Sequence, residues 1–141
     1  MPALSMGRTL DEWIERYNKK VPNGFKRDER FALFYLPDKG FCELVATDKM
    51  MILGQVGGDG RFWKEHAEQW ARELGLKVCG TYFTRKEAQA YIKLFSFKNV
   101  SVEEKDGFKR YRCTSEDGRW GLMTECLIDG KKRAYYVTWE V

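Results

Sequence analysis

A glycine-rich stretch between an apolar run and an amphipathic run is the part of this sequence whose residue types suggest chemistry. Gly57-Gly58-Asp59-Gly60 separates the apolar residues 50–56 from residues 61–74, which have helical spacing. Glycine lets the backbone turn its N–H groups toward a ligand, and a helix start carries a partial positive charge. This order of elements therefore predicts a cradle for a phosphate group. The alternative is that the glycines only make a tight turn.

Cysteine and histidine give weaker signals. The four cysteines include no C-x-x-C pair and the chain has one histidine, so the sequence argues against a metal site of the zinc type. We expect four reduced, mostly buried thiols. His66 lies among charged neighbours, and we expect it on the surface of a helix.

Basic and aromatic residues alternate near the C-terminus, where Phe108 and Tyr111 interleave with Lys109, Arg110 and Arg112. Such a pattern can hold single-stranded nucleic acid through phosphate contacts and stacking. Acidic residues lie close by in the sequence, and solvated strand faces have the same composition. The sequence therefore allows nucleic acid as a partner without favouring it.

The bulk properties indicate one globular domain. The chain has 141 residues, 43% of them hydrophobic, and a net charge of +4, which says little about partners. No apolar run reaches membrane-spanning length and the first residues do not read as a signal peptide, so we expect a cytoplasmic protein without membrane contact. The oligomeric state is not readable.

Local patterns place the elements around the glycine stretch. Capping boxes at residues 9–12 and 84–87 predict two helix starts. Helices are expected near residues 9–20, 61–74 and 85–95. Strands are expected at residues 31–36, 41–46, 50–56, 77–83, 100–103, 108–113, 119–128 and 134–141. Asp129-Gly130 favours a hairpin turn, and burial of Val137 and Trp139 would make the last strand structural.

The connections predict the fold class. Three strands joined by short turns imply an antiparallel meander. A helix linking the strands at 50–56 and 77–83 suggests a right-handed parallel crossover. We therefore expect an α/β (α+β) fold with a single mixed, mostly antiparallel sheet flanked by helices.

This order of elements is similar to the GCN5-related N-acetyltransferase (GNAT) fold. Gln55-Val56-Gly57-Gly58-Asp59-Gly60 matches the family's acetyl-CoA pattern Q/R-x-x-G-x-G/A, and residues 88–97 look like its fourth helix. The resemblance covers residues 31–102. It implies one GNAT-like domain over residues 1–141, with a glycine loop at 56–61 and a strand-rich C-terminal extension at 98–141. One departure is that family members usually place a few residues between the buried strand and the motif's Q/R, whereas here Gln55 belongs to the strand itself, so the loop is short.

The resemblance implies an acyl-CoA-dependent N-acyltransferase that uses acetyl-CoA, or another acyl-CoA, to acylate a small-molecule or protein amine. The cofactor would be bound by the motif and its flank, that is by Gln55, Val56, Gly57, Gly58, Asp59, Gly60 and Arg61. Family members often use a tyrosine of the fourth helix as general acid, and here the aligned position is Ile92, with Tyr91 next to it. Glu43 is the nearest acid that could serve as general base. The alternatives are a core or rim aromatic for Tyr91 and a solvent-facing strand residue for Glu43.

A second function is a GNAT-like domain without catalysis that binds a nucleic acid or a protein. The two functions differ in whether the space beside Val56 must be open. An enzyme needs an open gap that accommodates pantetheine, whereas a binding module can fill it with Tyr82 or Phe83.

Overall fold

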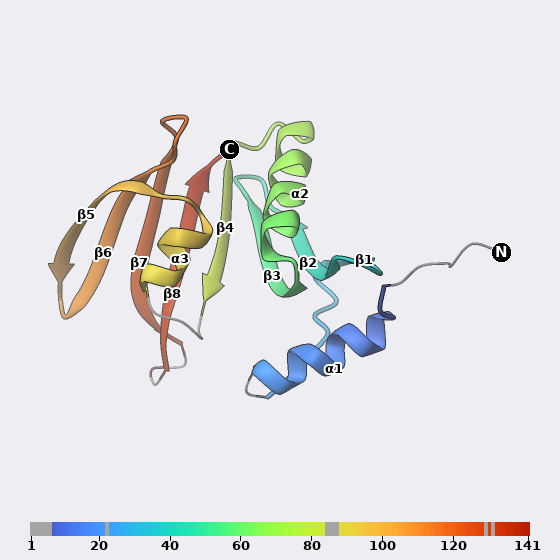
Figure 1. Ribbon diagram of the computed structural model, residues 1–141. Helices are drawn as coiled ribbons and strands as arrows, with labels where there is room; N and C mark the ends of the chain where they lie inside the picture. Colours follow the sequence, from blue (N-terminus) through green and yellow to red (C-terminus); the bar gives the residue numbers. More distant parts are fainter. Residues whose placement is uncertain (1–6, 22, 84–87, 129, 131) are drawn as a thin grey trace.

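A computed structural model describes residues 7–21, 23–83, 88–128, 130 and 132–141. Within these residues three helices and eight strands follow one another along the chain (Figure 1). Their bounds are α1 Leu10–Lys20, β1 Ala32–Leu36, β2 Gly40–Ala46, β3 Met51–Gly58, α2 Gly60–Glu73, β4 Val78–Phe83, α3 Ala88–Leu94, β5 Lys98–Lys105, β6 Phe108–Thr114, β7 Trp120–Ile128 and β8 Lys132–Glu140. None of these helices is both long enough and apolar enough to cross a membrane.

The strands form one sheet in the order β1-β2-β3-β4-β8-β7-β6-β5. The meander β1-β2-β3 is antiparallel, and β3 and β4, which α2 connects, are parallel neighbours. The remaining pairs are all antiparallel. The mixed, mostly antiparallel sheet is therefore confirmed, as are the meander and the parallel crossover.

The ends of the elements follow from local chemistry. At the start of α1, the Glu12 N–H donates to Thr9 Oγ1 at 3.1 Å and the Thr9 N–H donates to Glu12 Oε1 at 3.0 Å, which confirms the first capping box. The second capping box lies outside the described residues. At the final hairpin Asp129 is also outside them, but Gly130 has φ of 68° and Ile128 pairs with Lys132 around it.

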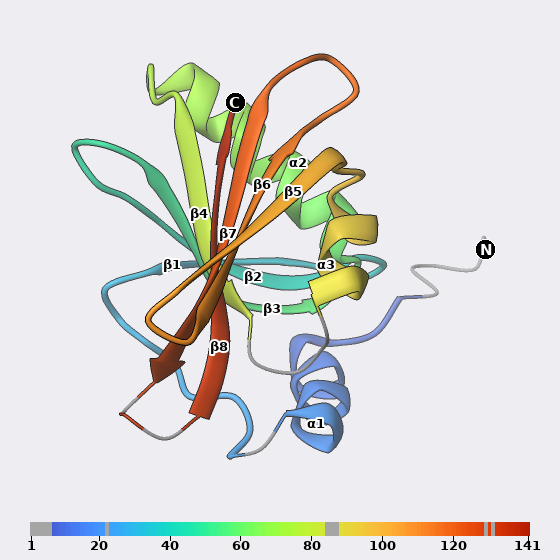
Figure 2. The ribbon, with the colours of Figure 1, turned by 90° about the vertical axis from the view of Figure 1, so that its left-hand side faces the viewer.

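The sheet is strongly twisted. In Figure 2 the strands β1 to β3 run across the view, while β4 and β7 run nearly up and down it. A right-handed twist is the ordinary property of strands, and it accumulates across a wide sheet. Here the twist separates the two ends of the sheet on either side of the parallel pair β3 and β4.

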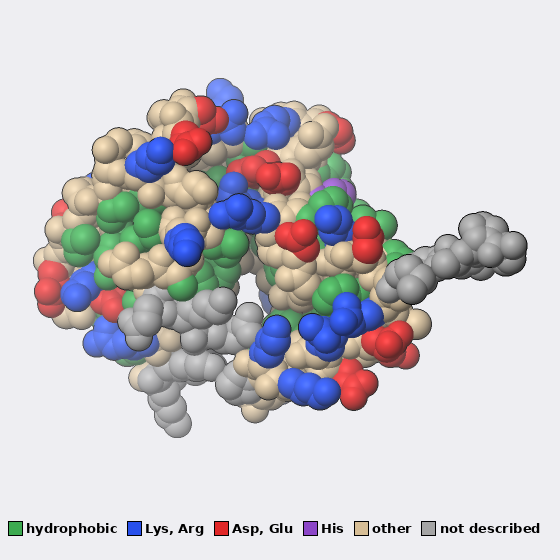
Figure 3. Space-filling model, viewed as in Figure 1, with side chains coloured by type: hydrophobic (Ala, Val, Ile, Leu, Met, Phe, Trp, Pro, Cys, Tyr) green, Lys and Arg blue, Asp and Glu red, His purple; other side chains and the backbone are tan. Residues whose placement is uncertain are grey.

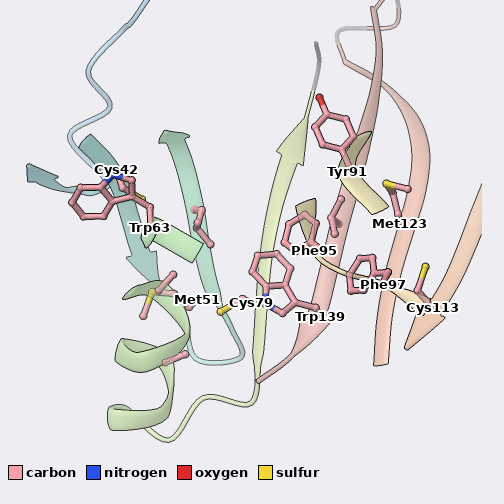
Figure 4. Close-up of a cluster of buried hydrophobic side chains, with 14 of the residues drawn as sticks. Cys42, Met51, Trp63, Cys79, Tyr91, Phe95, Phe97, Cys113, Met123 and Trp139 are labelled. Atoms are coloured by element: carbon pink, nitrogen blue, oxygen red, sulfur yellow. The ribbon is translucent and has the colours of Figure 1, made fainter. Parts of the chain in front are cut away.

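Buried side chains form two groups on one side of the sheet (Figure 4). Trp63 of α2 lies with Cys42 and Met51, whereas Tyr91 of α3 and Phe95, the residue after this helix, lie over β8 and β7. The two groups meet near Cys79 and Trp139, at the end where β3 and β4 are paired. The other side of β2 faces α1, because Phe41 contacts the Tyr17 ring at 5.4 Å.

Trp139 connects the C-terminal strand to α2 and to Phe95, the residue that follows α3. Its Nε1 donates to Glu68 Oε2 at 2.7 Å, and its ring lies 4.8 Å from that of Phe95. Lys64 completes the contact with an ion pair of 2.9 Å to Glu68. Since β8 lies between β4 and β7, the C-terminal residues are an interior part of the sheet.

Candidate functional site

The parallel strands β3 and β4 pair over only part of their length. Met51 is opposite Cys79 and Ile52 is opposite Gly80, yet β3 continues to Gly58. Next to these pairs, Thr81 Oγ1 donates a hydrogen bond of 3.0 Å to the Leu53 carbonyl oxygen. The two strands then diverge, as Figure 4 shows. Within the described residues, the β4-facing side of β3 therefore has no strand partner from Gly54 onward.

A cavity of about 940 Å³ occupies this gap. Figure 3 shows the hollow between the two halves of the molecule. Its walls come from β3, β4, α3, the first turn of α2 and the segment 23–31. Leu53 belongs to the core under α2, whereas Gly54 faces Phe31 and Glu43 on the other side of the sheet. The cavity thus crosses the sheet, and its volume is that of a site for a sizeable organic ligand.

The glycine stretch is more ordered than the sequence suggests. Gly57 and Gly58 extend β3 by two residues beyond the prediction, so the expected loop at 56–61 is reduced to Asp59 between strand and helix. Gly58 pairs with Gly40 at φ of 98°, and a Cβ there would lie 2.4 Å from the Lys39 carbonyl oxygen. A Cβ on Gly57 would lie 2.4 Å from the Phe41 ring. Close packing of β2 on β3 is therefore what requires these two glycines.

The first turn of α2 offers donors to an anion. The Asp59 carboxylate caps the helix by accepting from the Phe62 N–H at 3.0 Å. For the N–H groups of Gly60 and Arg61 no partner is found within the described part of the chain. A Cβ on Gly60 would meet nothing within 4 Å, so a ligand can approach the backbone at this residue. The helix start adds a partial positive charge.

Two further cations lie beside the end of β3. A second hollow of about 300 Å³ is lined by Arg16 and Lys20 of α1 together with Gly57 and Gly58. Tyr17 lines both hollows, which therefore adjoin. Sequence reasoning missed these cations because only folding brings α1 to β3. Their i, i+4 spacing, which places both on one helix face, was the available signal.

Glu43, the predicted base, is buried with 1% of its surface exposed, so it is not a solvent-facing strand residue. Its Oε2 accepts from Arg27 Nη1 at 2.8 Å and from the Asp28 N–H at 3.1 Å. Its Oε1 accepts from Gln55 Nε2 at 2.8 Å. Glu43 lines the cavity, but both of its oxygens are already engaged.

Gln55 points away from the α2 start with which the sequence grouped it. Its Oε1 accepts from the Lys26 N–H at 3.0 Å, and its Nε2 donates to the Lys26 carbonyl oxygen. Together with Glu43, it fastens residues 26–28 to β2 and β3. This segment forms one wall of the cavity.

Tyr91 lines the cavity, and the neighbouring Ile92 is not among the lining residues. The Tyr91 ring is buried and stacks on Phe83 with centroids 4.0 Å apart. Tyr82 is 54% exposed and packs against Tyr136 at 4.7 Å. Tyr82 and Phe83 are thus part of the cavity wall, and the space between β3 and β4 stays open.

The titratable groups near the cavity differ in whether they are ionised at neutral pH. Hydrogen bonds from the Arg30 side chain and backbone lower the pKa of Asp28 to about 2, so this acid stays ionised. Burial raises the pKa of the Cys79 thiol to about 12, and burial also raises that of Cys42. Neither thiol is a nucleophile at neutral pH. In the described residues no three histidine, cysteine or acidic side chains form a cluster that could hold a metal ion.

His66 is not the surface residue that its neighbours in the sequence suggested. It is half-buried on α2, with the rings of Phe34 and Trp63 at 5.0 and 5.5 Å. Its Nε2 is buried and has no hydrogen-bond partner in the described structure. The charged neighbours in the sequence lie on other faces of the helix.

The basic and aromatic residues near the C-terminus are not brought to the cavity. Several of their charges are paired on the surface: Arg112 contacts Glu103 at 2.9 Å, and Arg133 contacts Glu125 at 3.3 Å. The strands β5 to β8 therefore carry a balanced charge pattern, as solvated strand faces do.

Comparisons with protein-family models, with curated proteins and with solved structures find no match for this chain.

Proposed function

We propose that this protein is an acyl-CoA-dependent N-acyltransferase with a GNAT-like fold, using acetyl-CoA or another acyl-CoA to acylate an amine. The observation that carries the proposal is the divergence of the parallel strands β3 and β4 into a cavity that crosses the sheet beside the start of α2. Such a cavity admits a long ligand from one face and a second substrate from the other.

The residues around the α2 start suit the phosphate groups of the cofactor. The N–H groups of Gly60 and Arg61 can donate to the pyrophosphate, and the Arg61 side chain adds a charge. Arg16 and Lys20 line the adjoining hollow and suit a further phosphate. The edge of β3 beyond Leu53, which pairs with no described strand on the β4 side, offers backbone groups to the amides of the pantetheine arm.

The reaction needs a neutral amine and a proton for the leaving group. Bound acyl-CoA supplies the thioester carbonyl, at which a C–N bond forms as the C–S bond breaks. Tyr91 lies on the cavity wall and is the candidate donor of a proton to the departing thiolate. Glu43 is committed to Arg27 and Gln55, so in this account it holds the wall and does not remove the proton of the amine.

A binding module without catalysis is the second candidate, and one observation favours it. Among the described residues that line the cavity, both acids already have an ion-pair partner, because Glu43 contacts Arg27 and Asp28 contacts Arg30. An enzyme of this type must therefore work without a carboxylate base, whereas a module has no need of one.

Calorimetric titration with acetyl-CoA tests the proposal, together with an assay of CoA thiol release on a panel of amines. We expect saturable binding below millimolar concentration. Replacing both Arg16 and Lys20 with Ala should weaken binding about tenfold, at ~0.7 kcal/mol for each exposed ion pair. Lys77→Ala, an exposed change that lines neither hollow, is the control.

The outcomes separate the two candidates. Folded protein that gives no binding heat at millimolar acetyl-CoA would refute the proposal. Binding without thiol release from any amine of the panel would favour the module.

A further inference from the structure

Two of the cavity walls carry cations for which the described residues provide no ion-pair partner. Four basic side chains line the cavity, namely Lys26, Arg30, Arg61 and Lys93. Arg30 is paired with Asp28 at 2.7 Å. No ion pair is found for Lys26, Arg61 or Lys93 within the described residues. The lining therefore has an excess of positive charge.

Lys26 lies apart from the cations near the α2 start. Its backbone is held by Gln55, which precedes Gly58 by three residues on β3. Three residues of extended strand span about 10 Å, so the β3 residue that holds the Lys26 backbone is roughly this far from the end of β3. It belongs to the segment that lies with Phe31 against Gly54 and Glu43. This is the wall opposite the core that α2 and α3 cover.

The charge of this wall selects among amines. A cation near the reaction centre repels an ammonium group and lowers its pKa, which increases the fraction of neutral amine. The same cation attracts an anionic group on the same molecule. No carboxylate lining the described cavity is available to attract an acceptor that carries only positive charge.

We infer that the acceptor is a small amine that carries its own anionic group, a carboxylate or a phosphate, which Lys26 binds. This inference rests on the proposed function. It adds the chemical class of the acceptor, and it assigns Lys26 to acceptor specificity and not to cofactor binding. Lysine side chains in proteins and simple polyamines are thereby disfavoured.

The test compares matched acceptors with acetyl-CoA as donor. Phenylalanine and glycine are set against their amides, O-phosphoethanolamine against ethanolamine, and putrescine represents the purely cationic amines. The amino acid pairs and the phosphate pair show which anion is preferred. Initial rates of CoA thiol release give kcat and KM for each acceptor, and calorimetry gives the acetyl-CoA Kd separately.

The variants Lys26→Ala and Lys26→Glu assign the effect to this residue, with Lys77→Ala as the control. Both changes keep the backbone hydrogen bonds to Gln55. We expect Lys26→Ala to raise KM for the anionic acceptors about fivefold. Lys26→Glu should raise it about 25-fold, because an attraction is replaced by a similar repulsion. The acetyl-CoA Kd should not change in either variant.

The outcomes distinguish failure of the proposed function from failure of the inference about the acceptor. A protein that does not bind acetyl-CoA refutes the proposed function and the inference with it. The inference alone is overturned if acetyl-CoA binds but the amides, ethanolamine or putrescine react as well as the anionic acceptors. It is also overturned alone if other amines react and no anionic acceptor does. A change in the acetyl-CoA Kd in the Lys26 variants with no change in acceptor KM would assign this residue to the cofactor instead.

Discussion

At the scale of single residues, a buried carboxylate holds the wall of the cavity. Glu43 accepts three hydrogen bonds. Two come from the segment 26–28, from the Arg27 side chain and the Asp28 N–H, and the third comes from the Gln55 side chain on β3. A buried charge is stable only when its partners are present, so the carboxylate and this segment depend on each other. From the sequence Glu43 is a candidate general base, whereas its contacts suit the positioning of the segment 26–28 and Gln55.

We predict that Glu43→Gln lowers the free energy of unfolding by about 2 kcal/mol, because a charged acceptor is lost and an amide N–H₂ faces donors. Urea unfolding measures this change. Glu104→Gln on β5 is the matched control, since Glu104 is exposed. A variant as stable as the control that nevertheless abolished acyl transfer would instead identify Glu43 as the general base.

At the scale of elements, Gly58 and Gly60 at the junction of β3 and α2 have different structural roles. Gly58 is required by its positive φ and by the Lys39 carbonyl oxygen, whereas the position of Gly60 is open. The sequence presents them as equivalent members of one motif. The structure assigns the first to the β2–β3 pairing and leaves the second for ligand approach.

Substitutions at the two glycines should therefore separate folding from binding. Gly58→Val is expected to destabilise the protein by about 2–3 kcal/mol, because valine is strained at positive φ. Gly60→Val should leave the melting temperature nearly unchanged but weaken acetyl-CoA binding, since its side chain covers the N–H groups of the first turn. Thermal unfolding and calorimetry check the two effects. Equal destabilisation at both positions, or unchanged binding in Gly60→Val, would contradict this division.

Most of the elements could be predicted because their signals are local. The Thr9 cap, the helical stripes and the alternating strands place helices and strands close to the structure. The end of β3 could not be predicted, since Gly57 and Gly58 read as a loop until their packing on Phe41 and Lys39 is known. The segment 23–31 has neither helical nor strand periodicity, so its attachment to Glu43 and Gln55 could not be predicted either.

At the scale of the whole molecule, the proposed acyl transfer depends on where the twisted sheet opens. In the part of the chain that the structure describes, the sheet has eight strands and one parallel pair, which is joined at one end and apart at the other. The antiparallel pairs on both sides are longer and hold the two halves in place. The cavity is therefore a property of the topology, whereas its charge and its wall residues are properties of the sequence.

We propose that acyl-CoA lies between β3 and β4 with its phosphates at the start of α2. Backbone amide NMR during titration with acetyl-CoA tests this placement most directly. We predict that the largest shifts occur at Gly60 and Arg61 and along residues 53–56 and 81–83, with little change in β5 and β6. No shifts at saturating acetyl-CoA, or shifts confined to β5 and β6, would contradict it.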